Sequence, residues 1–74
     1  METRDMVRMA NQIAAFFTPY PEQEAIDGIA EHLTKFWDPR MRSMYFDHVA
    51  SGGAGFLPLV LAAATKVKRP KVAV

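Results

Sequence analysis

The chain has 74 residues, no cysteine and a formal net charge of only +1. This length predicts one small domain of marginal stability. The lack of cysteine excludes disulfides and thiolate metal sites. The near-neutral charge excludes a strong electrostatic field that would attract a polyanion. Chains below about 80 residues usually rely on disulfides, a metal or a partner, so a partner protein is the support that remains.

A first helix is predicted from about residue 3 to residue 17, with the hydroxyl of Thr3 as its cap. Its apolar residues recur at helical spacing, and Phe16 lies at the edge of their stripe. The stripe consists of Met6, Met9, Ala10, Ile13 and Phe17. Prolines at positions 19 and 21 end this helix, because proline removes a donor and restricts the residue before it.

A second helix is predicted over about residues 22–37, with Phe36 beside its buried stripe. The stripe consists of Ile26, Ile29, Ala30, Leu33 and Trp37. Gly28 lies in the middle, where glycine costs about 1 kcal/mol relative to alanine. Either a close helix–helix contact offsets this cost or the helix is locally weak. Because Gly28 falls on the polar side, we consider a contact with another chain there.

Residues 36–42 combine a helix end, the only tryptophan and a helix start. Asp38 precedes a proline, so its carboxylate can accept hydrogen bonds from the next turn while proline takes the first helical position. This corner presents Trp37 together with Arg40 and Arg42. It is interpreted either as an ordinary buried corner with solvated arginines or as a docking site for another protein.

A third helix is predicted from Pro39 to about Ala50. One face carries Met41, Met44, Tyr45, His48 and Val49. Phe46 points away from this face and is expected to be exposed or packed on another chain. The glycine-rich segment 51–55 ends the helix. It lacks the preceding strand and the following Lys-Ser or Lys-Thr of a phosphate-binding loop.

A fourth helix is predicted from about residue 56 to residue 67, and it is apolar nearly all round. Its stripe consists of Leu57, Val60, Leu61 and Ala64, widened by Leu59, Ala62 and Ala63. Four short helices cannot easily cover such a helix by themselves. The expected fold is all-α, a small bundle of three to four short helices over residues 1–67 with an irregular basic tail over residues 68–74.

No stretch of the sequence predicts a membrane or secretion segment. The longest uncharged run before the basic tail, residues 49–65, contains three glycines and a proline and is too short and broken to span a bilayer. The first five residues lack the basic start and apolar run of a secretory signal. We therefore expect a cytoplasmic protein without membrane contact.

The polar and titratable residues of this chain do not combine into a catalytic site. His32 and His48 each follow an acid, but neighbouring residues on a helix point about 100° apart and do not form a pair. A metal site would require the two helices to bring both histidines together. Without cysteine the chain cannot supply thiolates to a conventional iron–sulfur cluster. We expect neither an enzyme acting alone nor a cofactor in this chain.

Several short stretches, in this order and spacing over residues 7–63, resemble a known family. They are residues 8–13, 16–17, 28–32, 36–42, 52–53 and 57–60. The chain resembles the small delta subunit of soluble NAD-dependent, molybdenum-containing formate dehydrogenases. It departs from the family pattern at Tyr45 and Phe46, where aliphatic residues are expected, and the basic tail is not a family mark.

The resemblance implies a non-catalytic subunit of a cytoplasmic formate dehydrogenase that supports assembly or stability of the holoenzyme. It also implies that other subunits carry the molybdopterin cofactor, iron–sulfur clusters and FMN. We predict an interface with the larger subunits, the catalytic subunit favoured, where the planar fork of arginine can pair with carboxylates or carbonyls. The predicted interface residues are Phe36, Trp37, Arg40, Arg42, Phe46, Leu57, Pro58 and Leu59.

Two other functions stay open. A small nucleic-acid-binding module would use Arg4, Arg8, Arg40, Arg42 and the tail against phosphates, but the near-neutral charge and the acidic second helix argue against nucleic acid. A transient assembly factor for the same enzyme would need nearly the same surface. Stoichiometric presence in the purified complex separates a subunit from such a factor.

Overall fold

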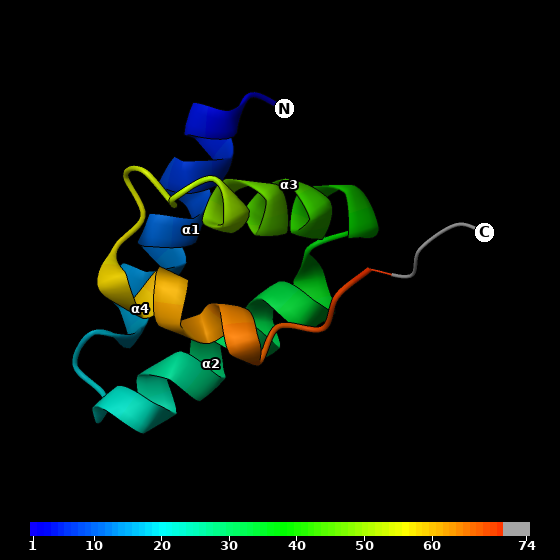
Figure 1. Ribbon diagram of the computed structural model, residues 1–74. Helices are drawn as coiled ribbons and strands as arrows, with labels where there is room; N and C mark the ends of the chain where they lie inside the picture. The colour runs from blue at the N-terminus through cyan, green and yellow to red at the C-terminus, as the bar shows by residue number, and fades with distance from the viewer. Residues whose placement is uncertain (71–74) are drawn as a thin grey trace.

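The computed structural model describes residues 1–70, which form four α-helices, a short 3-10 helix and no strand (Figure 1). The elements are α1 Thr3–Phe17, α2 Glu22–Phe36, α3 Pro39–Ala50, α4 Pro58–Ala62 and η1 Ala63–Thr65. The predicted all-α fold is confirmed. The last part of the predicted basic tail, residues 71–74, lies outside the described residues.

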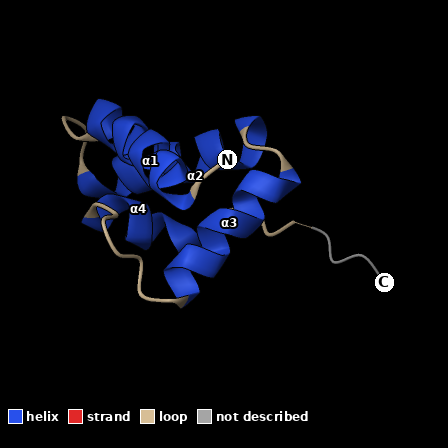
Figure 2. Cartoon of the chain, turned by 90° about the horizontal axis from the view of Figure 1, so that it is seen from above, coloured by secondary structure: helices blue, strands red, loops and turns tan. Residues whose placement is uncertain are grey.

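Helix α1 packs against each of the other three α-helices, while α4 and η1 close over α2. Figure 2 shows the loop between α3 and α4 running along the outside of the bundle. Asn11 ties this loop to α1, because its Nδ2 donates to the Gly55 carbonyl at 2.8 Å and its Oδ1 accepts from the Leu57 amide at 2.9 Å. The start of α4 is thereby held against α1.

The core is centred on Tyr45, whose side chain is fully buried. Its ring centroid lies 6.4 Å from that of Trp37, 5.1 Å from that of Phe46 and 5.7 Å from that of Phe56. The Tyr45 hydroxyl donates to the carbonyl oxygen of Val60 at 2.7 Å. One side chain of α3 therefore connects the α2–α3 corner, the loop and α4.

Burial raises the pKa of the Tyr45 phenol well above its ordinary value. The neutral phenol therefore contributes stability fully below pH about 10, where the unfolded group titrates, and this contribution is lost as the pH rises further. Above that pH we expect the free energy of unfolding to fall more steeply for the native chain than for Tyr45→Phe, by up to about 1.4 kcal/mol per pH unit. Denaturant unfolding at several alkaline pH values tests this, and parallel pH profiles would contradict it.

Of the two predicted side-chain caps, one is confirmed and one is wrong. Asp38 caps α3 as predicted, because its Oδ1 accepts from the Met41 amide at 2.9 Å and Pro39 follows it. The predicted cap of α1 is wrong, since Thr3 is already helical and Glu2 takes the cap position without a side-chain hydrogen bond. Instead, the Glu2 carbonyl accepts from the amides of Asp5 and Met6.

The fourth predicted helix is shorter than expected. Only Pro58–Ala62 is α-helical, and the 3-10 helix Ala63–Thr65 follows it. The buried side chains here are Val60, Ala63 and Val67, which follow one another at three and four residues, the spacing of one helical face. Leu57 and Leu61, two members of the predicted apolar stripe, are exposed.

Gly28 allows a close approach within the chain. A Cβ atom built on Gly28 would collide with the ring of Phe17 on α1. The predicted close helix–helix contact is therefore present, and it is made by α1 of the same chain rather than by another chain. The loss of helix propensity at Gly28 is thus associated with the packing of α2 on α1.

Candidate protein-interaction site

The α2–α3 corner divides its two aromatic side chains between core and surface. Trp37 is 5% exposed and packs edge-on against Tyr45, so it belongs mainly to the core. Phe36, the preceding residue, is 72% exposed. Its only aromatic contact among residues 1–70 is with the His32 ring, whose centroid lies 4.9 Å away. The aromatic side chain of the corner that lies at the surface is therefore Phe36.

The two arginines of the corner also differ. Arg40 is exposed and makes no hydrogen bond or ion pair within residues 1–70. Arg42 is half-buried, and its Nη1 donates at 2.9 Å to the carbonyl of Thr34 near the C-terminus of α2. Its Nε is buried without a partner among the described residues. Arg42 therefore holds α3 to α2, whereas Arg40 is directed to solvent.

The expectation that Phe46 is exposed or packed on another chain is wrong for this structure. Phe46 is 8% exposed and packs edge-on against Tyr45. The guanidinium carbon of Arg69 lies 4.3 Å from the centroid of its ring. The segment that follows η1 passes over this side of α3 and covers Phe46. The periodicity of α3 alone does not reveal this contact.

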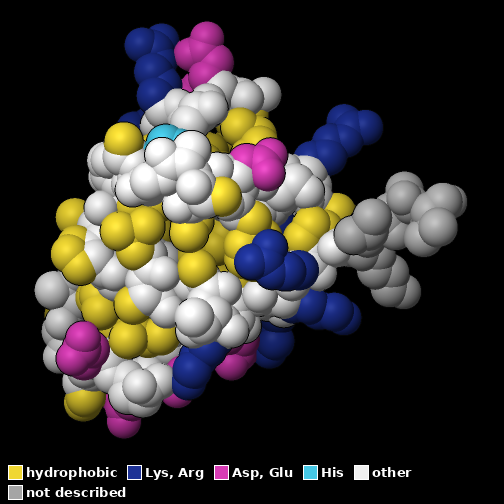
Figure 3. Space-filling view, in the orientation of Figure 1, with side chains coloured by type: hydrophobic (Ala, Val, Ile, Leu, Met, Phe, Trp, Pro, Cys, Tyr) yellow, Lys and Arg dark blue, Asp and Glu magenta, His cyan; other side chains and the backbone are white. Residues whose placement is uncertain are grey.

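Apolar side chains also reach the surface around α4. Leu57, Pro58 and Leu61 are exposed, and Leu59 is half-buried against the core. The space-filling view shows hydrophobic side chains gathered over this part of the molecule, with Lys and Arg side chains at its borders (Figure 3). The predicted interface residues that the structure leaves exposed are thus Phe36, Arg40, Leu57 and Pro58.

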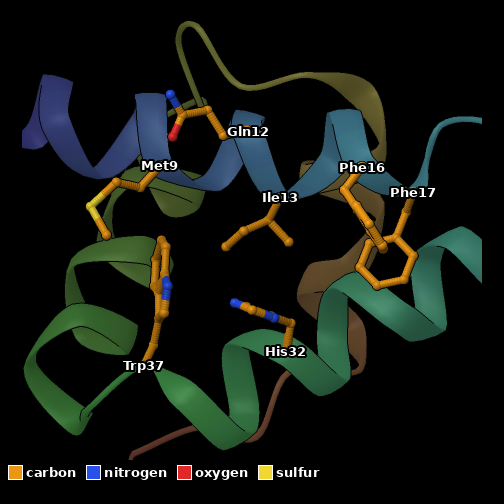
Figure 4. Close-up of a pocket in the computed structure, with 7 residues that line it drawn as sticks. All are labelled: Met9, Gln12, Ile13, Phe16, Phe17, His32 and Trp37. Carbon is orange, nitrogen blue, oxygen red and sulfur yellow. The ribbon is translucent and has the colours of Figure 1, made fainter.

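The sequence did not predict an open groove between α1 and α2, with a volume of about 520 Å³. Its lining residues are Met9, Gln12, Ile13, Phe16, Phe17, His32 and Trp37 (Figure 4). Phe16 is 67% exposed. The sequence signal for this groove was the position of Phe16 at the edge of the first apolar stripe, beside Phe17.

A smaller hollow continues this groove along α2. It is lined by Phe17, Gly28, Glu31, His32 and Phe36, so it shares two residues with the groove. At Gly28 the backbone of α2 lies close to the Phe17 ring. One apolar surface therefore extends from Trp37 through the α1–α2 groove to exposed Phe36.

Several surface charges pair with one another within residues 1–70. Arg4 pairs with Glu2 at 3.1 Å, and Arg8 with Asp5 at 3.5 Å. Lys66 donates to Asp27 at 2.6 Å, and this hydrogen bond, with one from Gln23, holds the pKa of Asp27 below its ordinary value. Arg4 and Arg8, two of the residues that a nucleic-acid-binding surface would use, thus already contact carboxylates.

The two histidines occupy different environments. His32 lines the groove, whereas a ring nitrogen of His48 lies 2.7 Å from the Ala54 carbonyl, and its ring packs on Phe56. Residues 1–70 contain no group of three or more His, Cys, Asp or Glu placed to hold a metal ion. None of the described helices has the length and apolar character needed to cross a membrane.

A comparison with protein families matches residues 5–64 to the NADH-dependent formate dehydrogenase delta subunit family, FdsD. The chain belongs to this family. The match spans nearly all of α1 and the whole of α2, α3 and α4, so the delta-subunit region includes the corner, the groove and the α4 surface. The predicted family resemblance is confirmed. Comparisons with curated proteins and with solved structures each found no significant match.

Proposed function

We propose that this chain is a non-catalytic subunit of a cytoplasmic NAD-dependent formate dehydrogenase. It supports assembly or stability of the holoenzyme through helix-mediated contacts with the larger subunits, most directly the catalytic subunit. The observation that carries this proposal is the exposure of Phe36, which is 72% accessible at the α2–α3 corner. Large aromatic side chains are enriched in protein interfaces, and this one lies four positions before Arg40, which has no hydrogen bond or ion pair within residues 1–70.

The redox chemistry of the complex is assigned to the other subunits. A conventional iron–sulfur cluster needs cysteine thiolates, and this chain has none. The residues present therefore do not fit such a cluster. We assign the molybdopterin cofactor, the iron–sulfur clusters and FMN to the larger subunits, and to this chain a role in their assembly or in the stability of the complex.

Arg40 and Phe36 form the first part of the proposed interface, and Leu57 with Pro58 forms the second. The Arg40 guanidinium can donate to a carboxylate or to backbone carbonyls of a partner, because no group within residues 1–70 engages it. Leu57 and Pro58 add apolar area at the start of α4. Arg42 contributes indirectly, by fixing the corner through the Thr34 carbonyl.

Separate alanine variants of the two arginines in the purified complex test this interface. For Arg40→Ala we expect about a tenfold loss of retention in the complex with unchanged unfolding of the chain, since a lost charged hydrogen bond at a contact costs about 1.5–3 kcal/mol. For Arg42→Ala we expect the chain itself to unfold at a lower temperature as well. Arg4→Ala, in an exposed α1 ion pair, is the control. Unchanged subunit ratios and formate oxidation in both test variants would contradict the proposed contact.

A further inference from the structure

The groove between α1 and α2 runs along the helix axes. In Figure 4, Ile13 from α1 and His32 from α2 point into it from opposite sides, Trp37 closes one end, and Phe16 and Phe17 stand at the other. Its α1 wall runs from position 9 to position 16, about 10 Å at 1.5 Å per residue. This length matches about two turns of a helix laid into the groove.

The lining of the groove is apolar apart from Gln12 and His32. Phe16 presents most of its surface to solvent, and Phe36 does so at the end of the adjoining hollow. An amphipathic helix can fill such a groove with side chains at positions i, i+3 or i+4, and i+7. Exposed aromatic rings at both ends would be covered by the same helix.

The two edges of the groove differ in charge. On the α2 edge, Glu31 accepts from Lys35 through Oε1 at 2.9 Å, while its Oε2 makes no hydrogen bond within residues 1–70. Glu24 lies two turns earlier on the same side of α2. On the α1 edge Gln12 is neutral, and Arg8 is paired with Asp5. A helix that complements this charge therefore carries a Lys or Arg on the side that faces α2.

A second copy of this chain does not supply that charge from the same face. Lys35 already contacts Glu31, and Arg8 already contacts Asp5. Two such faces brought together would place Glu31 and Glu24 of one copy near those of the other. The charge pattern therefore favours a different chain as the occupant.

We propose that the α1–α2 groove docks an amphipathic helix of a larger formate dehydrogenase subunit. Aliphatic side chains on successive turns of that helix fill the space around Ile13 and His32, and a basic side chain pairs with Glu31. This inference rests on the proposed function, because it takes the partner from the same complex. It adds a second contact surface to the exposed corner residue Arg40.

A charge reversal tests the acidic edge. Glu31→Lys is expected to lower retention of the chain in the complex by about fivefold at low salt, because an exposed pair is replaced by repulsion, and to have less effect at high salt. Glu2→Lys makes the same charge change at the start of α1, away from the groove. Equal retention of the two variants at low salt would overturn the proposed pairing.

Photo-cross-linking in the purified complex tests the occupant itself. A benzophenone amino acid replaces Gln12 inside the groove in one complex and Leu61 on the α4 surface in another. We expect the Gln12 position to cross-link to a larger subunit, at a segment with aliphatic residues at helical spacing and a nearby Lys or Arg. A cross-link to a second copy of this chain, or to a segment without that pattern, would overturn the inference.

The remaining outcomes separate this inference from the proposed function. If the chain is present in the complex and Gln12 gives no cross-link, groove docking is wrong while the subunit assignment stands. If the unsubstituted chain is absent from the active complex, the proposed function fails and groove docking fails with it. In the first case, a cross-link from the Leu61 position shows that the reaction works on a surface outside the groove.

Discussion

Tyr45→Ala is expected to leave the chain largely unfolded at temperatures where the native chain is folded. Tyr45 is fully buried, contacts three aromatic rings and donates to the Val60 carbonyl. Removing a large buried aromatic side chain costs about 3–5 kcal/mol, which is comparable to the whole stability of a domain of this size. Circular dichroism at 222 nm during heating measures the effect.

The matched variant Tyr45→Phe separates packing from hydrogen bonding. It keeps the ring and removes only the donor to Val60, so we expect a smaller loss of about 1–3 kcal/mol from the unsatisfied carbonyl. A Tyr45→Ala chain that melts within a few degrees of the native chain would contradict the central place of Tyr45 in the core. Equal losses in the two variants would show that the hydrogen bond, not the packing, dominates.

Phe36→Ser is expected to detach the chain from the formate dehydrogenase complex while leaving its own fold intact. Exposed residues away from caps and cores usually change stability by less than about 0.5 kcal/mol. Loss of an aromatic anchor at an interface costs about 2 kcal/mol or more, which corresponds to about a 30-fold loss of affinity. Affinity purification through a larger subunit, followed by quantification of the bound chain, measures this loss.

Lys35→Ser is the control for Phe36→Ser. Lys35 is adjacent on α2 and also exposed, and within residues 1–70 its ion pair is the exposed one with Glu31. Such pairs contribute about 1 kcal/mol or less. Full retention of Phe36→Ser would place the corner outside the interface, whereas equal loss in both variants would indicate a general effect on the end of α2.

Local sequence signals were sufficient for α1, α2 and α3 and for one cap. The Asp38-Pro39 pair predicted the start of α3 because both residues act within one turn, and the structure shows the hydrogen bond to Met41. Apolar periodicity predicted α1 and α2 to within a residue at most ends. The family could be predicted from short stretches whose order extends over most of the chain, and the match to residues 5–64 confirms it.

Features that depend on distant segments could not be read from helical periodicity. Phe46 is off the main stripe of α3, yet Arg69, 23 positions later, covers its ring. Arg42 was expected to face a partner, but its Nη1 reaches the Thr34 carbonyl on α2. In each case a neighbouring segment, which the pattern within α3 does not contain, decided the burial.

The candidate site was only partly predictable for the same reason. Phe36 and Arg40 are exposed at the corner, and the Asp38-Pro39 pair indicated this corner but not which of its two aromatic side chains lies at the surface. The groove arises from the side-by-side packing of α1 and α2, and the contact of Gly28 with Phe17 allows that packing. No pattern within either helix alone contains this information.

The amount of this chain in the purified active enzyme tests the subunit assignment most directly. Formate dehydrogenase is purified through a tag on a larger subunit, and the fraction that oxidises formate with NAD is separated by size exclusion. Quantitative mass spectrometry then measures the ratio of this chain to the catalytic subunit. We expect a constant stoichiometric ratio across the active peak. A chain found only in inactive assembly intermediates, or absent from the active peak, would contradict a permanent subunit.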